Sequence, residues 1–416
     1  MKSTNSIIDI DESFQIFRDY LDTVYAERKI HTIIPLSTGY QIGSVLSLPK
    51  DMLMQLLPMK NGKEIERGGY GWNFDSTGLK DAIASYENTK IGSETYSIQN
   101  ICLTLGGTYG LNRLIHLLSS PEDEMLIVGP TFVRLFGQVK KKLEIKMIIG
   151  NADKGFVLSS KEILEHVTSN TKFIFICNPS NPLYTFMPAL IIDHLINEVK
   201  KRKIYLILDE VGDAYRTQKF QNYSYSNHIK SDYVIRICSA SKSFLLAEYR
   251  LGYTLSNSDI AKKLSREISD DVSHINIGAT EAWKYGLEQE QLRLKHQDDT
   301  MKKVNTQFIR TYKTNQKKLL ECRNIAISAL KRCKKVTKII YPDACFSFLF
   351  KVETNRFQDD IALFKSLLLE TGISLVPGSG FGLKKSDLFL RLTYAYPKRE
   401  LKKTILKITK FLEILC

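Results

Sequence analysis

The sequence predicts an α/β protein in which a large domain with a mostly parallel sheet covered by helices is followed by a smaller α+β domain. Two observations support this prediction. Short apolar, strand-like runs alternate with helix-like segments from about residue 98 to 260. The pattern becomes long, charged and helical from about 288 to 335, and short strands and helices then return. Apolar strands separated by helices are typical of parallel sheets with both faces buried.

The predicted elements follow in order along the chain. The strand-like runs of the large domain are NICLTLGG, DEMLIVGP, LEIKMIIG, TKFIFICNP, IYLILDE and DYVIRICSAS, and IDHLINEVKKRK has the period of a helix. Further along, ACFSFLFKVE and LFLRLTYAYP are predicted strands, and DDIALFKSLLLETG is a predicted helix that ends at Gly372. We expect an N-terminal segment, 1–50, that packs with the small domain, a large domain, 51–290, and a small domain, 291–416.

Composition excludes several classes of function. The chain has 416 residues, 43% of them hydrophobic, which is enough for large cores. The formal net charge is +14, but the lysine runs adjoin apolar segments and no nucleic-acid-binding motif is visible, so no nucleic-acid partner is expected. Seven scattered cysteines and seven dispersed histidines predict neither disulfides nor a metal site, and they favour a reducing cytoplasm. No signal peptide or membrane-spanning run is expected.

Unusual residues follow several of the predicted strands. They are Gly106-Gly107-Thr108, Asn178 to Pro182, Asp209-Glu210 and Ser239 to Lys242. Ligands of open α/β sheets bind beyond the carboxyl ends of the strands, so these residues are candidates for one site. The first three also have a purely structural interpretation: a tight turn, a loop shaped by its prolines, and a helix cap or ion pair at the acidic pair.

Lys242 is the most informative of these residues. It lies in SASKSFLLAEYRLGY, between two serines and just before an apolar run. A solvated lysine would have polar neighbours, whereas a lysine in a partly dry pocket has a lowered pKa and becomes a nucleophile.

Together these features resemble the class I/II aminotransferase family, the fold-type-I enzymes that depend on pyridoxal 5′-phosphate (PLP). The resemblance runs from about Leu36 to the last helix. It is carried by S-x-S-K at 239–242, followed by R-x-G-Y at 250–253; by N-P-x-N-P at 178–182; by the D-E pair at 209–210; and by P-G-S-x-F-G at 377–382 with R-L-x-Y-A at 391–395. The resemblance implies that the large domain binds PLP.

The resemblance implies a role for each matching position. Lys242 would form the Schiff base with PLP and then move the substrate α-proton. Asp209 would pair with the pyridinium nitrogen, and Asn181 would bind the ring's 3′ oxygen close to the substrate. Arg391 would clamp the substrate α-carboxylate as a bidentate fork, and Gly39 would lie under the substrate.

Further positions would hold the cofactor. Phe132 would stack on the ring, and the phosphate would be bound by Gly107, Thr108, Ser239 and Arg250. Tyr70 matches a tyrosine that reaches the phosphate of the neighbouring subunit, so the resemblance also implies a homodimer with shared active sites.

Some positions depart from the family pattern. Gly212 stands where the family commonly has a tyrosine that donates to the ring's 3′ oxygen, and either Tyr215 or Tyr184 could replace it. The family's P-T-G segment reads Pro182-Leu183-Tyr184, Glu248 stands where a small residue is usual, and Ala344 or Cys345 stands where glycine is usual.

The expected function is a PLP-dependent aminotransferase that acts on an α-amino acid, in amino-acid metabolism or biosynthesis. The alternative is a PLP enzyme of elimination, replacement or cyclisation, which the departures around Gly212 favour. A non-catalytic sensor is disfavoured by intact Lys242, Asp209 and Arg391. No second arginine is assigned to a distal substrate carboxylate, and Asp213 with Glu248 would favour a basic side chain.

Overall fold

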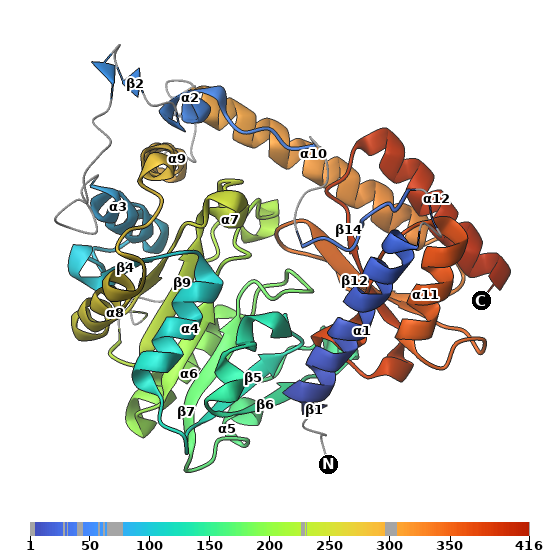
Figure 1. Ribbon diagram of the computed structural model, residues 1–416, viewed down its shortest axis with the longest axis horizontal. Helices are drawn as coiled ribbons and strands as arrows, with labels where there is room; N and C mark the ends of the chain where they lie inside the picture. The colour runs from blue at the N-terminus through green and yellow to red at the C-terminus, as the bar shows by residue number, and fades with distance from the viewer. Residues whose placement is uncertain are drawn as a thin grey trace.

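The structure is a computed structural model of the 416-residue chain. It describes residues 5–27, 30, 32–39, 45–56, 59–60, 63–64, 78–225, 229, 231–295 and 306–415. A large sheet with helices on both faces forms one part of the molecule, and a smaller sheet with long helices forms the other (Figure 1). None of the helices in these ranges is long and apolar enough to cross a membrane.

The large sheet has eight strands in the order β1-β6-β5-β7-β8-β9-β10-β4. Strands β6, β5, β7, β8 and β9 are parallel, whereas β10 is antiparallel to β9 and β4, and β1 to β6. The predicted, mostly parallel sheet is thereby confirmed. The strands are β1 (Asn5–Ser6), β4 (Ile101–Thr104), β5 (Glu124–Gly129), β6 (Glu144–Ile149), β7 (Thr171–Cys177), β8 (Tyr205–Asp209), β9 (Val234–Ser239) and β10 (Gly252–Leu255).

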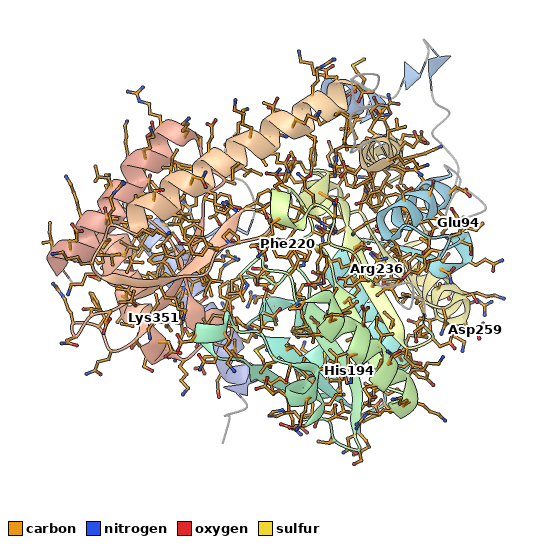
Figure 2. The ribbon with its side chains drawn as sticks, turned by 180° about the vertical axis from the view of Figure 1, so that it is seen from behind. Glu94, His194, Phe220, Arg236, Asp259 and Lys351 are labelled. Atoms are coloured by element: carbon orange, nitrogen blue, oxygen red, sulfur yellow. The ribbon has the colours of Figure 1, made fainter. Side chains whose placement is uncertain are left out.

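Helices cover both faces of this sheet because its strands are apolar on both sides. On β7, Phe173 and Phe175 pack with α4 (Gly107–Leu118) and α8 (Ser258–Val272). Ile174 and Ile176 point the other way, toward α3 (Leu79–Ile91), α6 (Ala189–Arg202) and α9 (Ile277–Lys295). Helix α4 lies in front of the sheet in Figure 1, and α6, which carries His194, lies in front in the reverse view of Figure 2.

The small sheet is antiparallel, with the order β11-β12-β14-β13. Its strands are β11 (Val336–Ile339), β12 (Ser347–Val352), β13 (Val376–Pro377) and β14 (Phe389–Thr393). Three helices pack with it: α10 (Gln307–Leu330), α11 (Asp360–Thr371) and α12 (Lys398–Leu415). As predicted, α11 ends at Gly372, whose φ of 71° is the left-handed conformation that closes many helices.

Helix α1 (Ile7–Ala26) joins the two parts of the molecule. The Phe17 ring packs on Phe364 of α11 at 4.9 Å, and the Phe14 ring contacts both Phe381 and Phe132, which lies in the loop after β5. Figure 1 shows α1 beside the small sheet, with the chain start at β1 on the edge of the large one. This position brings α1 next to the carboxyl ends of the parallel strands.

The remaining elements are short. Helices α2 (Lys50–Leu53), α5 (Ser160–Leu164) and α7 (Ala240–Ser243) lie in connections, and β2 (Met59–Lys60) pairs with β3 (Lys63–Glu64). The most important is α7, since it begins where β9 ends and carries Lys242.

Candidate active site

A cavity of about 570 Å³ lies at the carboxyl ends of β7, β8 and β9, between the start of α4, helix α1 and strand β14. The register of the sheet pairs Cys177 with Asp209 and Asp209 with Ile237, so these strand ends are adjacent. Apart from Tyr70, which falls outside the described ranges, all the predicted site residues line the cavity: Gly39, Gly107, Thr108, Phe132, Asn181, Asp209, Ser239, Lys242, Arg250 and Arg391.

Lys242 enters the cavity from the short helix α7. Ser239 caps this helix, because its Oγ accepts a hydrogen bond from the Ser241 backbone N–H at 3.1 Å. The Lys242 Nζ donates to the Gly39 carbonyl oxygen. Burial lowers the pKa of Lys242 to about 8, and the nearby positive charge of Arg391 acts in the same direction. The structure therefore places here an amine that loses its proton far more readily than a surface lysine.

Asp209 ends strand β8 and is 6% exposed. Its Oδ1 accepts a hydrogen bond from the Val211 backbone N–H at 3.0 Å, and Cys177 Sγ lies 3.8 Å from its Oδ2. Within the described ranges no basic side chain pairs with this carboxylate, and burial raises its pKa to about 6. A carboxylate in such a setting gains free energy from a cationic partner on a ligand, such as a protonated ring nitrogen.

The start of α4 and Arg250 form a cradle for an anion. Gly106 has a φ of 85°, and a Cβ added to it would lie 2.8 Å from Arg250 Nη2. A Cβ on Gly107 would lie 2.7 Å from Val211 Cγ2, so only glycine fits where the helix meets the sheet. The first backbone N–H groups of α4, the Thr108 side chain and the Arg250 guanidinium are at this end of the cavity. Such groups together bind phosphate.

Arg391 lies on β14 and is only 3% exposed. Its Nη1 donates to Asn181 Oδ1 at 3.2 Å and its Nη2 to the Ser37 carbonyl oxygen, while its Nε has no hydrogen-bond partner. The guanidinium lies over the Phe381 ring, and burial lowers the pKa of Arg391 to about 10. No carboxylate of the described chain neutralises it, so the site has a buried cation that fits an anionic ligand group.

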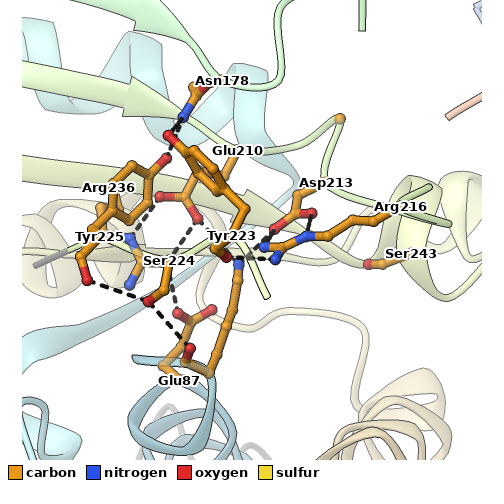
Figure 3. Close-up of polar contacts among 12 residues, drawn as sticks. Glu87, Asn178, Glu210, Asp213, Arg216, Tyr223, Ser224, Tyr225, Arg236 and Ser243 are labelled. Atoms are coloured by element: carbon orange, nitrogen blue, oxygen red, sulfur yellow. Dashed lines mark hydrogen bonds and ion pairs between the residues drawn. The ribbon is translucent and has the colours of Figure 1, made fainter. Parts of the chain in front are cut away.

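Glu210, the neighbour of Asp209, belongs to a buried ion-pair cluster outside the cavity (Figure 3). Arg236 on β9 is fully buried and binds Glu210 through two contacts of 2.7 Å, and it reaches Glu87 of α3 at 2.6 Å. The structural interpretation of the acidic pair as an ion pair thus holds for Glu210. Asp209 instead faces the cavity, because successive side chains of a strand point to opposite faces.

The same cluster holds the loop that follows β8. Lys90 Nζ contacts Asp213 at 2.7 Å and Glu210 at 3.3 Å, and Arg216 forms a two-point contact with Asp213. Glu87, Glu210 and Asp213 are thus matched by the cations Lys90, Arg216 and Arg236. Buried charges balanced in this way keep the loop in one conformation, and the loop fixes the position of Asp209.

Asn178 anchors the neighbouring loop after β7. Its Nδ2 donates to the hydroxyls of Tyr223 at 2.9 Å and Tyr225 at 2.8 Å, and its Oδ1 accepts from the Met187 backbone N–H. Figure 3 shows Asn178 at one end of this polar network and Arg216 at the other. Asn178 is therefore structural, whereas Asn181 of the same motif faces the cavity.

The structure also shows where the off-pattern residues lie. Gly212 and Tyr184 line the cavity, whereas Tyr215 packs on Tyr312 with ring centroids 5.1 Å apart and is absent from the cavity wall. The hypothesis that Asp213 and Glu248 select a basic side chain is not supported: Asp213 is engaged by Lys90 and Arg216, Glu248 is exposed, and neither lines the cavity.

Sequence reasoning missed the contribution of α1. Arg18 and Asp22 lie one helical turn apart and line the cavity together with Ser37 and Thr38. Arg18 is the additional arginine that the sequence did not assign. No local motif marks it, since its place depends on how α1 packs against the small domain.

These groups fit PLP. The glycine-lined start of α4 with Arg250 suits a phosphate, the unpaired Asp209 suits a ring nitrogen, and Lys242, which loses its proton more readily than a surface lysine, suits an aldehyde carbon. The unpartnered Nε of Arg391 remains for the carboxylate of an amino acid. A mostly parallel sheet with this set of groups at its strand ends defines a fold-type-I PLP enzyme.

Comparison with known proteins places the chain in a family. Residues 59–408 match the family model of aminotransferase class I and II, and the chain belongs to this family. It is 25% identical over 370 residues to an aspartate aminotransferase of Sulfurisphaera tokodaii, covering 85% of each chain. It is also 25% identical over 344 residues to an asparagine–oxo-acid transaminase of Streptococcus mutans, covering 80% of this chain and 81% of the relative.

A solved structure has the same fold. The crystal structure of an aspartate aminotransferase from Thermotoga maritima superposes with a TM-score of 0.79 at 24% identity, covering 95% of this chain and 96% of the other. The family match confirms the predicted family and its cofactor, and the superposition confirms the predicted fold class. The protein is a PLP-dependent aminotransferase.

Proposed function

We propose that Lys242 and Arg391 together hold an α-amino acid for transamination, with Asp209 supporting the cofactor ring. One observation carries this proposal. A Cβ placed on Gly39 would lie 3.9 Å from Lys242 Nζ and 3.8 Å from Arg391 Nη1, so the amine and the guanidinium face one small space. An amino acid whose carboxylate binds Arg391 would present its Cα hydrogen to Lys242.

PLP, when bound, supplies the electron sink that makes the Cα hydrogen of an amino acid acidic. The chain's own groups do the rest. Lys242, whose pKa is lowered to about 8, would take the proton from Cα. It would then pass this proton to the aldehyde carbon of PLP. The Asp209 carboxylate would keep a proton on the ring nitrogen, and Arg391 would fix the Cα–H bond in line with the Lys242 amine.

The remaining predicted residues would hold the cofactor. We assign the phosphate to Gly107, Thr108, Ser239 and Arg250, and one face of the ring to Phe132. The Phe132 ring is held by an edge contact with Phe14 of α1, with centroids 5.5 Å apart, which would restrict its rotation. Asn181 would donate to the ring's oxygen while its Oδ1 accepts from Arg391.

The side chain of the substrate would point toward α1. The names of the relatives, aspartate aminotransferase and asparagine–oxo-acid transaminase, suggest an acidic or amide side chain. Arg18 on the cavity wall has the positive charge to bind such a group. Asp22, one helical turn away, partly offsets that charge. We therefore propose aspartate and asparagine as the first donors to test.

We further propose a homodimer in the cytoplasm, in which Tyr70 of each large domain, residues 51–290, completes the phosphate site of the partner. The family resemblance supports the dimer, and the reduced cysteines expected from the sequence support the compartment.

The test is amino transfer by the purified protein. The protein loaded with PLP is incubated with aspartate or asparagine and 2-oxoglutarate, and glutamate and the new 2-oxo acid are quantified. Equal amounts of the two products support the proposal. Binding of PLP without glutamate formation from either donor would contradict transamination of these donors. Lys242→Ala should form neither product, and wild-type protein that binds no PLP would overturn the assignment altogether.

A further inference from the structure

Tyr184 is the one tyrosine among the described residues that line the cavity, and it is 1% exposed. Its ring occupies the space beside Gly212. A Cβ on Gly212 would lie 3.3 Å from Tyr184 Cε1, 3.4 Å from its Cδ1 and 3.1 Å from the Pro179 carbonyl oxygen. A side chain at residue 212 would therefore be crowded by the Tyr184 ring and by the Pro179 carbonyl oxygen.

The backbone of Tyr184 is held in an uncommon conformation. Its φ is 54°, in the left-handed region that large side chains rarely adopt. Its carbonyl oxygen accepts N–H groups from Asp343 at 2.8 Å and Ala344 at 3.1 Å, and its own N–H donates to the Ser180 carbonyl oxygen. Such backbone strain persists where the surroundings impose it, and it is found most often at ligand sites.

Cys345 holds the opposite side of the same space. Its Sγ donates to the Gly212 carbonyl oxygen at 2.8 Å, and its backbone N–H donates to the Ala214 carbonyl oxygen at 2.8 Å. The loops after β7 and β8 and the segment before β12 thus meet at one place. The off-pattern residues Tyr184, Gly212 and Cys345 are consequently one structural unit rather than separate substitutions.

The Tyr184 side chain lies close to both Arg391 and Ser347 of β12, and Tyr184 and Arg391 each shift the pKa of the other. Arg391 Nη1 is hydrogen-bonded to Asn181, so a phenol, a guanidinium and an amide share one corner of the cavity. Burial raises the pKa of Tyr184 far above its usual value, which keeps the hydroxyl protonated and able to donate. Tyr215, the other candidate, is committed elsewhere, since its hydroxyl accepts from Asn315 Nδ2 at 3.3 Å.

We propose that Tyr184 is a ligand-binding residue of this site, whose hydroxyl donates a hydrogen bond to an anionic ligand oxygen held in the corner of Arg391 and Asn181. This inference rests on the proposed function. Two ligands of the site carry an anionic oxygen that fits this position: the substrate, through its α-carboxylate, and PLP, through its phenolic oxygen. Gly212 is the residue that leaves room for the Tyr184 ring.

The experiment compares Tyr184→Phe with wild type in two binding titrations. The first measures the Kd of PLP for the apo-protein, and the second the Kd of maleate, a dicarboxylate without an amino group, for the PLP-loaded protein. Loss of a hydrogen bond to a charged oxygen weakens binding by roughly tenfold or more. The matched control is Tyr215→Phe, which removes a buried hydroxyl outside the cavity and should change neither Kd.

The outcomes separate the two sources. Weaker PLP binding alone assigns the oxygen to the cofactor, and weaker maleate binding alone assigns it to the substrate carboxylate; either result supports the proposal. If Tyr184→Phe changes neither Kd while wild type binds both ligands, the proposal is overturned. If wild type does not bind PLP, the proposed function itself fails, and the melting temperature of each apo-protein shows whether the variants are folded.

A second pair of variants tests the shared space. Gly212→Ala should lower the melting temperature of the apo-protein, because its Cβ would press on the Tyr184 ring. In a Tyr184→Ala background the same change should cost less, since only the contact with the Pro179 carbonyl oxygen then remains. Equal effects of Gly212→Ala in both backgrounds would show that the ring does not occupy this space.

Discussion

At the scale of single residues, the site depends on charged groups held away from water. Lys242 and Asp209 have pKa values shifted toward their neutral forms by burial, and Arg391 is a buried cation without a carboxylate partner in the described chain. Such groups cost folding free energy and are retained where a ligand neutralises them. Lys242 and Arg391 can each be tested on this basis.

The first prediction concerns the pH dependence of PLP attachment. The reactive form of Lys242 is the neutral amine, and its pKa is about 8. The rate of attachment to the apo-protein should therefore rise about tenfold per pH unit below pH 8 and level off above it. Stopped-flow absorbance after mixing apo-protein with PLP measures this profile. A rate that still rises toward pH 10 would mean that Lys242 titrates like an ordinary surface lysine.

The second prediction concerns Arg391. Arg391→Met removes the cation that the substrate carboxylate needs, whereas Arg391→Lys keeps the charge but loses the bidentate geometry. We expect kcat/KM for amino acids to fall by at least about a hundredfold in Arg391→Met and by less in Arg391→Lys. PLP affinity measured in the same variants should stay near wild type. A large loss of PLP affinity instead would show that Arg391 serves the cofactor.

At the scale of elements, the carboxyl ends of β7, β8 and β9 place the loops that carry the site, and two structural features keep those loops in register. One is the buried ion-pair cluster of Glu87, Lys90, Glu210, Asp213, Arg216 and Arg236 behind β8. The other is the close contact of α4 with the sheet at Gly107. Each can be tested by a variant with a matched control.

Arg236→Met should destabilise the protein strongly. It would leave Glu87 and Glu210 buried without their cation, and breaking such a cluster costs about 3–5 kcal/mol of unfolding free energy. Chemical denaturation of the apo-protein measures the loss. Lys201→Met removes an ion pair whose lysine side chain is 71% exposed, and it should cost less than about 1 kcal/mol. Similar losses in the two variants would contradict a special role for the cluster.

Gly107→Ala should weaken PLP binding more than it affects folding. The added Cβ would collide with Val211 Cγ2 and move the start of α4 away from the sheet, and the amides there would no longer converge on the phosphate. Titration of the apo-protein with PLP should give a Kd at least about tenfold higher. The control is Gly137→Ala, where the nearest atom to an added Cβ is 3.6 Å away, and PLP affinity should be unchanged.

At the scale of the whole molecule, the proposed dimer predicts complementation between inactive variants. Lys242→Ala and Tyr70→Ala each damage a different half of a shared site. When the two are refolded together, half of the dimers should be mixed, and each mixed dimer should contain one intact site. The mixture should recover about a quarter of wild-type activity. Recovery should be absent when either variant is refolded alone, and its absence from the mixture would count against shared sites.

Much of this protein could be predicted from its sequence because the signals are local. The apolar strand runs, the helix that ends at Gly372, the lysine among small residues and the acidic pair after β8 each follow from neighbouring residues. The predicted site residues are spread from Gly39 to Arg391, and apart from Tyr70, which lies outside the described ranges, they line one cavity. Those that follow strands of the large sheet meet because parallel strands align their carboxyl ends at one edge of the sheet, whereas Gly39 and Arg391 reach the cavity from the N-terminal segment and from β14.

The tertiary structure alone decided what depends on packing between distant segments. Nothing local to Arg18 marks it as part of the cavity wall, and nothing local to Glu210 shows that Arg236 neutralises it while Asp209 stays unpaired. The family and the cofactor could be read from the sequence, and Lys242 could be singled out as a candidate, because these rest on residue types at short spacings. The partner of each buried charge, and the tyrosine that fills the space beside Gly212, depend on contacts between segments far apart in the chain.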